Sequence, residues 1–431
     1  MKFGTDGVRG EALTELTVDY VAALGRAAAQ VLGGGRWLIG RDTRESGPAL
    51  EAAVAAGLAA GGAEPVTMGV LPTPALAWLA AELGLPAAMV TASHNPWHDN
   101  GVKIFGAGGL KLADDVERRI ESAIVLDGAV QAHMLDIDEG AVARYVDHIV
   151  AAAGSLHGVH VVLDCANGAM SSVAPVAFER CGARVTVLHA APDGRNINLA
   201  CGATDVASLS AAVVETGAHL GLAFDGDGDR VIAVDHLGRT VDGDRLIALA
   251  ALRLRDDGAL HHDTVVVTVM SNIGFHRAMA AAGVNVVTTA VGDRYVLEAL
   301  EAGGFSIGGE QSGHIIYRDL ATTGDGLLAG VRLARYVHDS DEPLATSADR
   351  VMVGYPQVLL NVRVAERHPH AASELADEIA AAEQELGGDG RVLVRASGTE
   401  PLIRVMVEAA TDAVATSVAE RLAAVVAARF G

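Results

Sequence analysis

Three aspartates at alternate positions form the densest cluster of reactive side chains in the sequence. Asp225, Asp227 and Asp229 are separated by single glycines and follow an apolar segment. Because glycine lets the backbone curl tightly, all three carboxylates can face one hard cation such as Mg²⁺. An EF-hand is excluded, because its loop requires Gly and Glu where this sequence has Arg230 and His236. The segment predicts a metal site with an incomplete oxygen shell; an acidic solvated turn and a structural calcium loop are the alternatives.

A serine stands where another apolar segment ends. Residues 89–105 read MVTASHNPWHDNGVKIF, so Ser93 and His94 follow a predicted strand and Lys103 comes shortly after them. A serine hydrolase is not expected, because there is no G-x-S-x-G elbow and adjacent Ser and His do not normally meet as nucleophile and base. We expect Ser93 to carry a phosphoryl group whose charge is met by the metal, Lys103 and Arg230. A polar turn with an extended lysine is the alternative.

Arginines flank a segment near the end of the chain that is rich in glycine and hydroxyl groups. Residues 395–401 read RASGTEP, and Arg404 follows closely. Guanidinium groups, hydroxyls and unobstructed backbone N–H groups are suitable donors for a phosphate monoester. The segment predicts an anion site, and a plain turn between two strands is the alternative.

Two further glycine-rich segments carry weaker signals. Residues 308–314 read GGEQSGH, and their polar side chains suit hydrogen bonds to sugar hydroxyls, although a β-hairpin turn explains them as well. Residues 3–10 read FGTDGVRG, and Arg9 together with Arg41 and Arg44 predicts a positive cluster in the first domain.

Composition limits the class of protein. The 431 residues are 50% hydrophobic and exceed the size at which one core stops growing, about 250–300 residues, so three or four domains are expected. The formal net charge of −22 argues against nucleic acid or an anionic membrane as partner, but a local arginine cluster can still bind a small anion. No signal peptide or membrane span is evident, and three widely spaced cysteines fit buried side chains in a reducing compartment. We therefore expect a soluble, cytoplasmic protein.

A repeated order of strand, glycine-rich turn and helix organises most of the chain. Segments 37–40, 159–163 and 264–269 are predicted strands that each lead into a polar turn and a helix, which indicates mostly parallel sheets. After a linker-like segment at 339–343, an amphipathic helix at 371–386 is expected among the strands of a smaller domain. The expected fold class is α/β, with three similar α/β domains of mixed, mostly parallel sheets and a smaller C-terminal α+β domain. Their expected bounds are 1–140, 141–238, 239–345 and 346–431.

Taken in order, the motifs resemble those of the α-D-phosphohexomutase superfamily over essentially the whole chain. They are FGTDGVRG, TASHNP with NGVKIF, DGDGDR, VGDRYV, GGEQSGH and RASGTEPLIRV. The first and fifth are most similar to the branch that acts on glucosamine phosphates, rather than to the phosphomannomutase/phosphoglucomutase branch. Thr91 and Trp97 depart from the superfamily pattern, but only at the flanks of the serine motif.

The resemblance implies an enzyme of four domains, each contributing one loop to a central cleft. It would interconvert glucosamine 6-phosphate and glucosamine 1-phosphate through a phosphoserine and a glucosamine 1,6-bisphosphate that turns round between two transfers. Carried over, Ser93 is the phosphorylated serine, and one Mg²⁺ per chain is bound by a phosphoserine oxygen, Asp225, Asp227 and Asp229. Sugar hydroxyls are assigned to Glu310 and Ser312, and the phosphate not being transferred to Arg395, Ser397, Gly398, Thr399 and Arg404. Proton transfer and phosphate neutralisation are assigned to Arg9, His94, Lys103 and His314, with Lys103 expected as the general acid/base.

Other functions and states remain open from the sequence. The rivals are a phosphomannomutase/phosphoglucomutase of the same superfamily, a non-catalytic phosphosugar-binding protein and a metal-dependent phosphatase. A monomer or a homodimer is expected.

Overall fold

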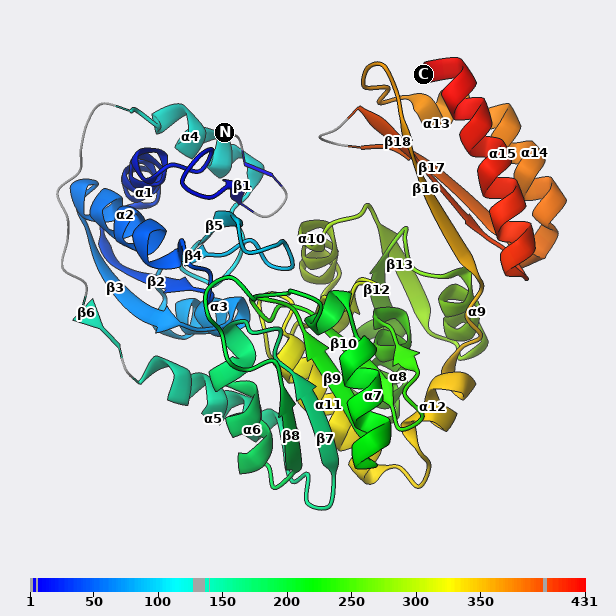
Figure 1. Cartoon of the computed structure of the whole chain (residues 1–431), viewed down its shortest axis with the longest axis horizontal. Coiled ribbons are helices and arrows are strands. Elements are labelled where there is room, and N and C mark those ends of the chain that lie inside the picture. The colour runs from blue at the N-terminus through cyan, green and yellow to red at the C-terminus, as the bar shows by residue number, and fades with distance from the viewer. Residues whose placement is uncertain (1–2, 5–6, 127–135, 139, 398–400) are drawn as a thin grey trace. The chain divides into compact units, whose positions relative to one another are not determined.

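The computed structural model describes residues 3–4, 7–126, 136–138, 140–397 and 401–431 (Figure 1). The chain forms two compact units. The larger comprises residues 1–270 and 284–350, and the smaller comprises residues 271–283 and 351–431. None of the helices in the described ranges is long and apolar enough to cross a membrane.

The first sheet of the larger unit has six strands. In spatial order they are β1 (Val8–Glu11), β5 (Asp99–Phe105), β4 (Ala87–Val90), β2 (Gly35–Arg41), β3 (Ala63–Val70) and β6 (Asp136–Ile137). Its helices are α1 (Val18–Leu32), α2 (Gly47–Ala60), α3 (Thr73–Leu83) and α4 (Asp114–Ala123). Helices α1 and α2 approach closely because Gly57 faces the backbone of Ala22, where a Cβ would lie 2.0 Å from the carbonyl oxygen.

Two more sheets complete the larger unit. One has the order β11 (Thr240–Val241), β10 (Val231–Asp235), β9 (Leu220–Phe224), β7 (His160–Asp164), β8 (Arg184–Leu188), with helices α5 (Ala141–Ala153), α6 (Ala174–Arg180) and α7 (Ala207–Thr216). The other has the order β13 (Asn285–Thr289), β12 (Thr264–Thr268), β14 (Ile307–Gly309), β15 (Ile315–Tyr317), with helices α8 (Gly243–Asp256), α10 (Asp293–Gly303) and α11 (Gly326–Asp339). Helix α12 (Leu344–Val351) follows, and short 3₁₀ turns are η1 (Ala169–Ser172), η2 (Gly202–Thr204) and η3 (His261–Asp263).

The smaller unit is built on a three-stranded antiparallel sheet. Its strand order is β16 (Gln357–Arg363), β18 (Leu402–Glu408), β17 (Arg391–Ala396). Its helices are α9 (Ile273–Ala281), α13 (Ala371–Glu374), α14 (Ala376–Leu386) and α15 (Asp412–Phe430), with a 3₁₀ turn η4 (Gly387–Asp389). Apolar side chains of the sheet and of α15, among them Val405, Val407 and Leu422, form one buried core.

The predicted fold class is confirmed: the sheets are mixed and mostly parallel, helices cover them, and the C-terminal domain is smaller. The predicted strands at 37–40, 159–163 and 264–269 appear as parts of β2, β7 and β12. The helix expected at 371–386 is instead two helices, because Leu375 leaves helical geometry at φ −107° and ψ 17°. All three cysteines are buried and free, as expected.

The functional motifs share one structural position. The serine loop joins β4 to β5, the aspartate loop joins β9 to β10, and the GGEQSGH segment joins β14 to β15. Each of these pairs is antiparallel, and so is the pair β17 and β18 on either side of the RASGTEP segment. Each of the four motifs therefore lies between two antiparallel strands, although the three sheets of the larger unit also contain parallel pairs.

Candidate active site

Ser93 lies at the tip of the β4–β5 connection in a left-handed backbone conformation. Its φ is +53°, which is uncommon for a non-glycine residue and costs conformational energy. Its side chain is buried, and its backbone N–H donates to Thr91 Oγ1 at 3.0 Å. Its hydroxyl donates to Asp225 Oδ2 at 2.6 Å. The fold thus aims the Ser93 hydroxyl at the aspartate loop.

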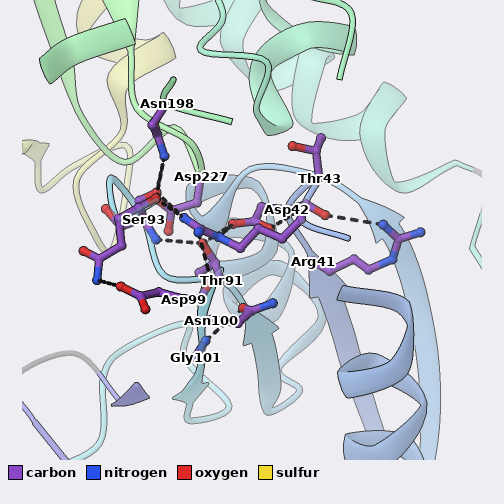
Figure 2. A network of polar contacts seen from close by, with 12 residues as sticks. Arg41, Asp42, Thr43, Thr91, Ser93, Asp99, Asn100, Gly101, Asn198 and Asp227 are labelled. Atoms are coloured by element: carbon purple, nitrogen blue, oxygen red, sulfur yellow. Dashed lines mark hydrogen bonds and ion pairs between the residues drawn. The ribbon is translucent and has the colours of Figure 1, made fainter. Parts of the chain in front are cut away.

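Arg44 holds the serine loop from behind. Its guanidinium is fully buried, pairs with Asp42 at 2.9 Å, and donates to four backbone carbonyls of the loop, which belong to Ser93, Asn95, Pro96 and Asp99. Asn198, from the connection between β8 and η2, donates to the carbonyl of Ser93 at 2.9 Å (Figure 2).

This arrangement corrects the predicted positive cluster of Arg9, Arg41 and Arg44. The guanidinium of Arg44 donates hydrogen bonds to backbone carbonyls, and Arg41 pairs with Glu51 at 3.0 Å. Sequence reasoning missed Arg44 as a scaffold of the serine loop. The available signal was its place two residues after Asp42, directly behind a predicted strand.

Replacing Arg44 by lysine is expected to destabilise the protein by about 2–4 kcal/mol. Lysine keeps the charge but cannot make the planar set of bonds to Asp42 and several carbonyls at once. Urea unfolding would measure the loss, with Arg41→Lys as the control because Arg41 is partly exposed and makes a single carboxylate contact at 3.0 Å. Equal stability of the two variants would contradict the scaffold.

The three aspartates of the β9–β10 loop are all buried and converge. Their ligand atoms lie within 4.8 Å of one another. Burial, followed by the charges of Asp229 and Asp227, raises the pKa of Asp225 well above its ordinary value. Such a cluster needs cations because mutual repulsion and lost hydration disfavour three carboxylates without them.

The carboxylates fit a metal ion. Asp227 Oδ1 and Asp229 Oδ1 are buried and make no hydrogen bond, which leaves oxygen lone pairs for a cation. Three carboxylates and no soft ligand suit Mg²⁺. Asp227 Oδ2 is instead used by the protein, since it accepts from Thr73 Oγ1 at 2.5 Å.

Lys103, which the sequence predicted as a partner of the phosphoryl group, is buried beside the aspartate loop. From β5, its Nζ lies 2.9 Å from Asp227 Oδ2 and 3.2 Å from Asp229 Oδ2. Together, Ser93, Lys103 and the aspartates place a hydroxyl, an ammonium group and a candidate metal site side by side. Such a group can offset the charge of a phosphoryl group on Ser93.

His94 departs from expectation. Its Nδ1 lies 3.3 Å from Ser93 Oγ, so the adjacent pair does meet. The shorter bond of the hydroxyl, however, goes to Asp225. Burial, with the charges of Arg230 and Arg9, lowers the pKa of His94 to about 4. His94 is therefore neutral at pH 7 and a weak base, which disfavours the hydrolase pairing.

The GGEQSGH hairpin docks on the aspartate loop. Arg230 and His314 form an antiparallel bridge, and Val231 N donates to the Gly313 carbonyl at 3.0 Å. His314 is buried, with Nδ1 3.8 Å from Asp229 Oδ1. Burial lowers its pKa, but the negative charge of Asp229 close by outweighs burial and raises the pKa above the ordinary value.

The remaining predicted residues of the larger unit lie around this group. Ser312 is exposed and its hydroxyl lies 3.5 Å from Glu310 Oε2, while Glu310 Oε1 accepts from Gly292 N at 3.1 Å. Arg9 lies on β1, where it pairs with Gly101 of β5. Arg230 is largely buried, and its Nε lies 3.9 Å from Asp229 Oδ1.

In the smaller unit, Arg395 and Arg404 face each other across the β17–β18 pair. Ser397 is buried, and its N–H donates to the Leu402 carbonyl at 2.9 Å. Two arginines therefore flank the loop, as the anion-site prediction requires. Gly398 and Thr399 lie outside the described residues.

A buried aspartate next to the sugar hairpin gives a pH-dependent prediction. Asp325 accepts from Tyr145 Oη at 2.9 Å, and burial raises its pKa from 3.8 to about 6. Because the folded protein holds this proton more tightly than the unfolded chain, Asp325 contributes stability at low pH that is lost as pH rises from about 4 through about 6.

The free energy of unfolding of Asp325→Asn, relative to that of the wild type, should therefore increase by on the order of 3 kcal/mol between about pH 4 and pH 7. Asparagine can still accept from Tyr145, so the hydrogen bond is retained. Urea unfolding across this range would measure the difference, and a difference independent of pH would contradict the prediction.

Asp164, His189 and Cys201 form another group of metal-ligating types among the described residues. The carboxylate of Asp164, however, already accepts from Ala166 N at 2.9 Å and Gly202 N at 3.0 Å. This aspartate organises the turn after β7, so the DGDGD loop is the better candidate metal site.

Family models match most of the chain. They describe phosphoglucomutase/phosphomannomutase, with alpha/beta/alpha domain I at residues 1–127, domain II at 143–238, domain III at 242–355 and the C-terminal domain at 359–425.

Curated relatives are similar over their whole length. Phosphoglucosamine mutase of Rhodococcus jostii (strain RHA1) is 51% identical over 441 residues, covering 99% of both chains. That of Streptomyces griseus subsp. griseus is 51% identical over 450 residues, covering 100% of this chain and 99% of the relative.

Solved structures share the fold. A phosphoglucomutase/phosphomannomutase family protein from Burkholderia thailandensis is 25% identical with a TM-score of 0.82, over 99% of this chain and 97% of that one. Aspergillus fumigatus N-acetylphosphoglucosamine mutase, in complex with GlcNAc-6P and magnesium, has a TM-score of 0.74 at 18% identity, over 100% and 96% of the two chains.

Proposed function

The chain belongs to the phosphoglucomutase/phosphomannomutase family, and we propose that it interconverts glucosamine 6-phosphate and glucosamine 1-phosphate. The observation that carries a mutase chemistry is the Ser93 hydroxyl, 2.6 Å from Asp225 in a loop whose other aspartates bind Lys103. The choice of the amino sugar is supported by the full-length identity to curated phosphoglucosamine mutases.

In this proposal Ser93 carries the phosphoryl group. The group passes from the serine oxygen to O1 of glucosamine 6-phosphate. The proton of O1 is removed and one is delivered to the serine oxygen as its bond to phosphorus breaks, which gives the 1,6-bisphosphate and an unphosphorylated Ser93. That bisphosphate turns round, and its 6-phosphoryl group passes to the Ser93 oxygen. The serine hydroxyl loses its proton and O6 gains one, which leaves glucosamine 1-phosphate and the phosphoserine. Lys103 is the expected general acid/base, and Arg230 helps to neutralise the transferred group.

Mg²⁺ would be held by Asp225, Asp227, Asp229 and an oxygen of the phosphorylated serine, and would neutralise charge on the phosphoryl group. Their burial and the two oxygens without hydrogen bonds support this assignment. Lys103 keeps the excess negative charge of the loop low before a phosphoryl group is present.

Binding of the sugar and of the second phosphate is assigned to the other two hairpins. Glu310 and Ser312 lie close enough to bind neighbouring hydroxyls, and His314 is placed beside Asp229. The arginine-flanked loop of the smaller unit, with Arg395, Ser397, Gly398, Thr399 and Arg404, would hold the phosphate that is not transferred. The same loop can serve either phosphate of the bisphosphate, which suits a reorienting intermediate.

We further propose that these loops belong to four domains at 1–140, 141–238, 239–345 and 346–431. The four family matches, each falling on a different part of the chain, support this division.

Arg395→Ala is expected to raise KM by about 10- to 100-fold while kcat falls much less, because the loop binds a phosphate remote from the reacting one. Steady-state kinetics would measure the split. Arg363→Ala is the matched control, since Arg363 is exposed on the neighbouring antiparallel strand pair. An unchanged KM in Arg395→Ala would count against the loop.

The proposed function is tested by assaying isomerisation of glucosamine, glucose and mannose phosphates side by side, with Mg²⁺ and a catalytic amount of the cognate bisphosphate. Preference for the glucosamine phosphates in kcat/KM is expected. Preference for glucose or mannose phosphates would indicate a phosphomannomutase/phosphoglucomutase instead. Release of inorganic phosphate without isomerised product would indicate a phosphatase instead.

A further inference from the structure

The segment 321–326, which reads ATTGDG, spans the end of the connection between β15 and α11 and the first residue of α11. It belongs to none of the four motif loops. It nevertheless touches two of them and the turn that follows β5. Gly324 N donates to His314 Nε2 at 3.0 Å, and Gly326 N donates to the Gly228 carbonyl in the aspartate loop at 3.1 Å. Thr322 Oγ1 donates to the Gly109 carbonyl at 2.8 Å, in the turn that follows the Lys103 strand.

The space that a side chain at position 324 would need is occupied by one other side chain. A Cβ at this position would lie 2.4–2.6 Å from three ring atoms of His314, and no other group is as near. Its φ lies outside the left-handed range, so alanine is compatible with the backbone. The glycine is therefore required by the imidazole rather than by the turn.

The hydrogen bond from Gly324 selects a tautomer. A backbone N–H can only donate to a ring nitrogen that has a lone pair, so Nε2 is unprotonated and the proton of the neutral ring lies on Nδ1. Nδ1 faces Asp229, at 3.8 Å from Oδ1, and Nε2 lies 3.6 Å from Asp293 Oδ2. Both carboxylate distances exceed hydrogen-bond length, so the bond from Gly324 N at 3.0 Å is the shortest contact of Nε2. The contact thus orients the donor of His314 toward the aspartate loop.

The segment is itself anchored from two sides. Asp325 accepts from Leu328 N at 2.9 Å as the N-cap of α11, and both its carboxylate oxygens accept from Tyr145 Oη of α5 at 2.9 Å. Asp325 N donates to the Ile315 carbonyl at 3.1 Å, directly after His314. Because residues 321–326 are held from both sides, they can hold the residues that they contact in a fixed position.

We propose that residues 321–326 are a positioning element of the active site, in which Gly324 sets the tautomer and orientation of His314 against the aspartate loop. The segment acts through His314 and the loop, so its members are positioning residues. The consequence for turnover rests on the proposed function, whereas the tautomer of His314 does not.

The first test is ¹⁵N NMR of the histidine rings at alkaline pH, with His314 assigned through His314→Ala. In the wild type, Nε2 should show the shift of an unprotonated nitrogen, and in Gly324→Ala the His314 signals should move or exchange. Gly108→Ala is the matched control, because its Cβ would meet nothing nearer than 3.9 Å and its φ is also outside the left-handed range. A wild-type Nε2 that carries the proton, or His314 shifts identical in Gly324→Ala and wild type, would overturn the proposal.

The second test is a double-mutant cycle. Gly324→Ala alone should lower kcat by about 10- to 100-fold with KM within about twofold, whereas Gly108→Ala should change neither. In the His314→Ala background the ring is gone, so adding Gly324→Ala should cost no further activity or melting temperature. If Gly324→Ala lowers activity or melting temperature equally in both backgrounds, its effect is a general structural one and the proposal is overturned. The melting temperatures allow this comparison even if the single variant is too unstable for an activity assay.

The two tests separate this inference from the proposed function. If the wild type lacks mutase activity but Gly324→Ala changes the His314 tautomer, the positioning element stands and the proposed reaction fails. If the wild type is an active mutase and the His314 signals are indifferent to Gly324→Ala, the proposed function stands and the positioning element fails.

Discussion

Ser93→Ala is expected to abolish turnover, with a loss of at least about 10⁴-fold in kcat. The hydroxyl is the only group at the tip of the β4–β5 loop that can form the phosphoester, and no water can return the same phosphoryl group to the substrate. Alanine should leave the fold intact, because the side chain is small and the bonds from Arg44 and Asn198 go to the backbone carbonyl of residue 93. Steady-state isomerisation in both directions would measure the loss.

Intact-protein mass spectrometry supplies an independent readout of the same prediction. After incubation with the bisphosphate, the wild type should carry one added phosphoryl group that Ser93→Ala lacks. Ser122→Ala is the control, because Ser122 lies on α4 and donates only to a carbonyl of its own helix. Activity of Ser93→Ala within a few-fold of wild type, or no phosphorylation of an active wild type, would contradict the phosphoserine.

The residues that carry charge or nucleophilicity could be predicted from the sequence. Ser93, Lys103 and the aspartates come together in the structure. Ser93 and the aspartates follow directly after apolar strands, where polar groups must reach a loop, whereas Lys103 lies within β5. The strand pattern also predicted the α/β class. It did not show that each functional loop would join antiparallel strands, since periodicity does not reveal strand direction.

The supports of the site could not be predicted in the same way. Arg44 binds backbone carbonyls some distance along the chain, and Thr73 and Asn198 reach the site from other elements. Carbonyl acceptors exist at every residue, so no sequence pattern marks the ones that a buried guanidinium will use. The contact of His94 with Ser93 was also missed, because the left-handed turn at Ser93 brings adjacent side chains together.

Removal of the metal is expected to abolish activity almost as completely as loss of the serine. Chelation should lower kcat by at least about 10³-fold, and Mg²⁺ should restore it, because the aspartate loop alone repels a phosphoryl group. Asp225→Asn should lose most of the Mg²⁺ affinity, since it removes the charge of one of three ligands. Calorimetric titration with Mg²⁺ in the absence of substrate would measure that affinity directly.

Stability gives a second measurement of the same site. At a Mg²⁺ concentration about 100 times Kd, binding should stabilise the wild type by about 2.7 kcal/mol. In the metal-free wild type, the raised pKa of Asp225 means that its contribution is present at low pH and lost as pH rises above the ordinary carboxyl range. Mg²⁺ should reverse that loss, and Asp225→Asn should not show it.

Asp115→Asn is the control for the charge change, because Asp115 is exposed in the first turn of α4, away from the aspartate loop. It should keep the wild-type response to Mg²⁺ in both activity and stability. If Asp225→Asn bound Mg²⁺ as tightly as the wild type, the metal would have to be held elsewhere. The buried carboxylates would then have to be balanced by Lys103, Arg230, His314 and a proton, and Ser93 would have to transfer its phosphoryl group without a divalent cation beside it.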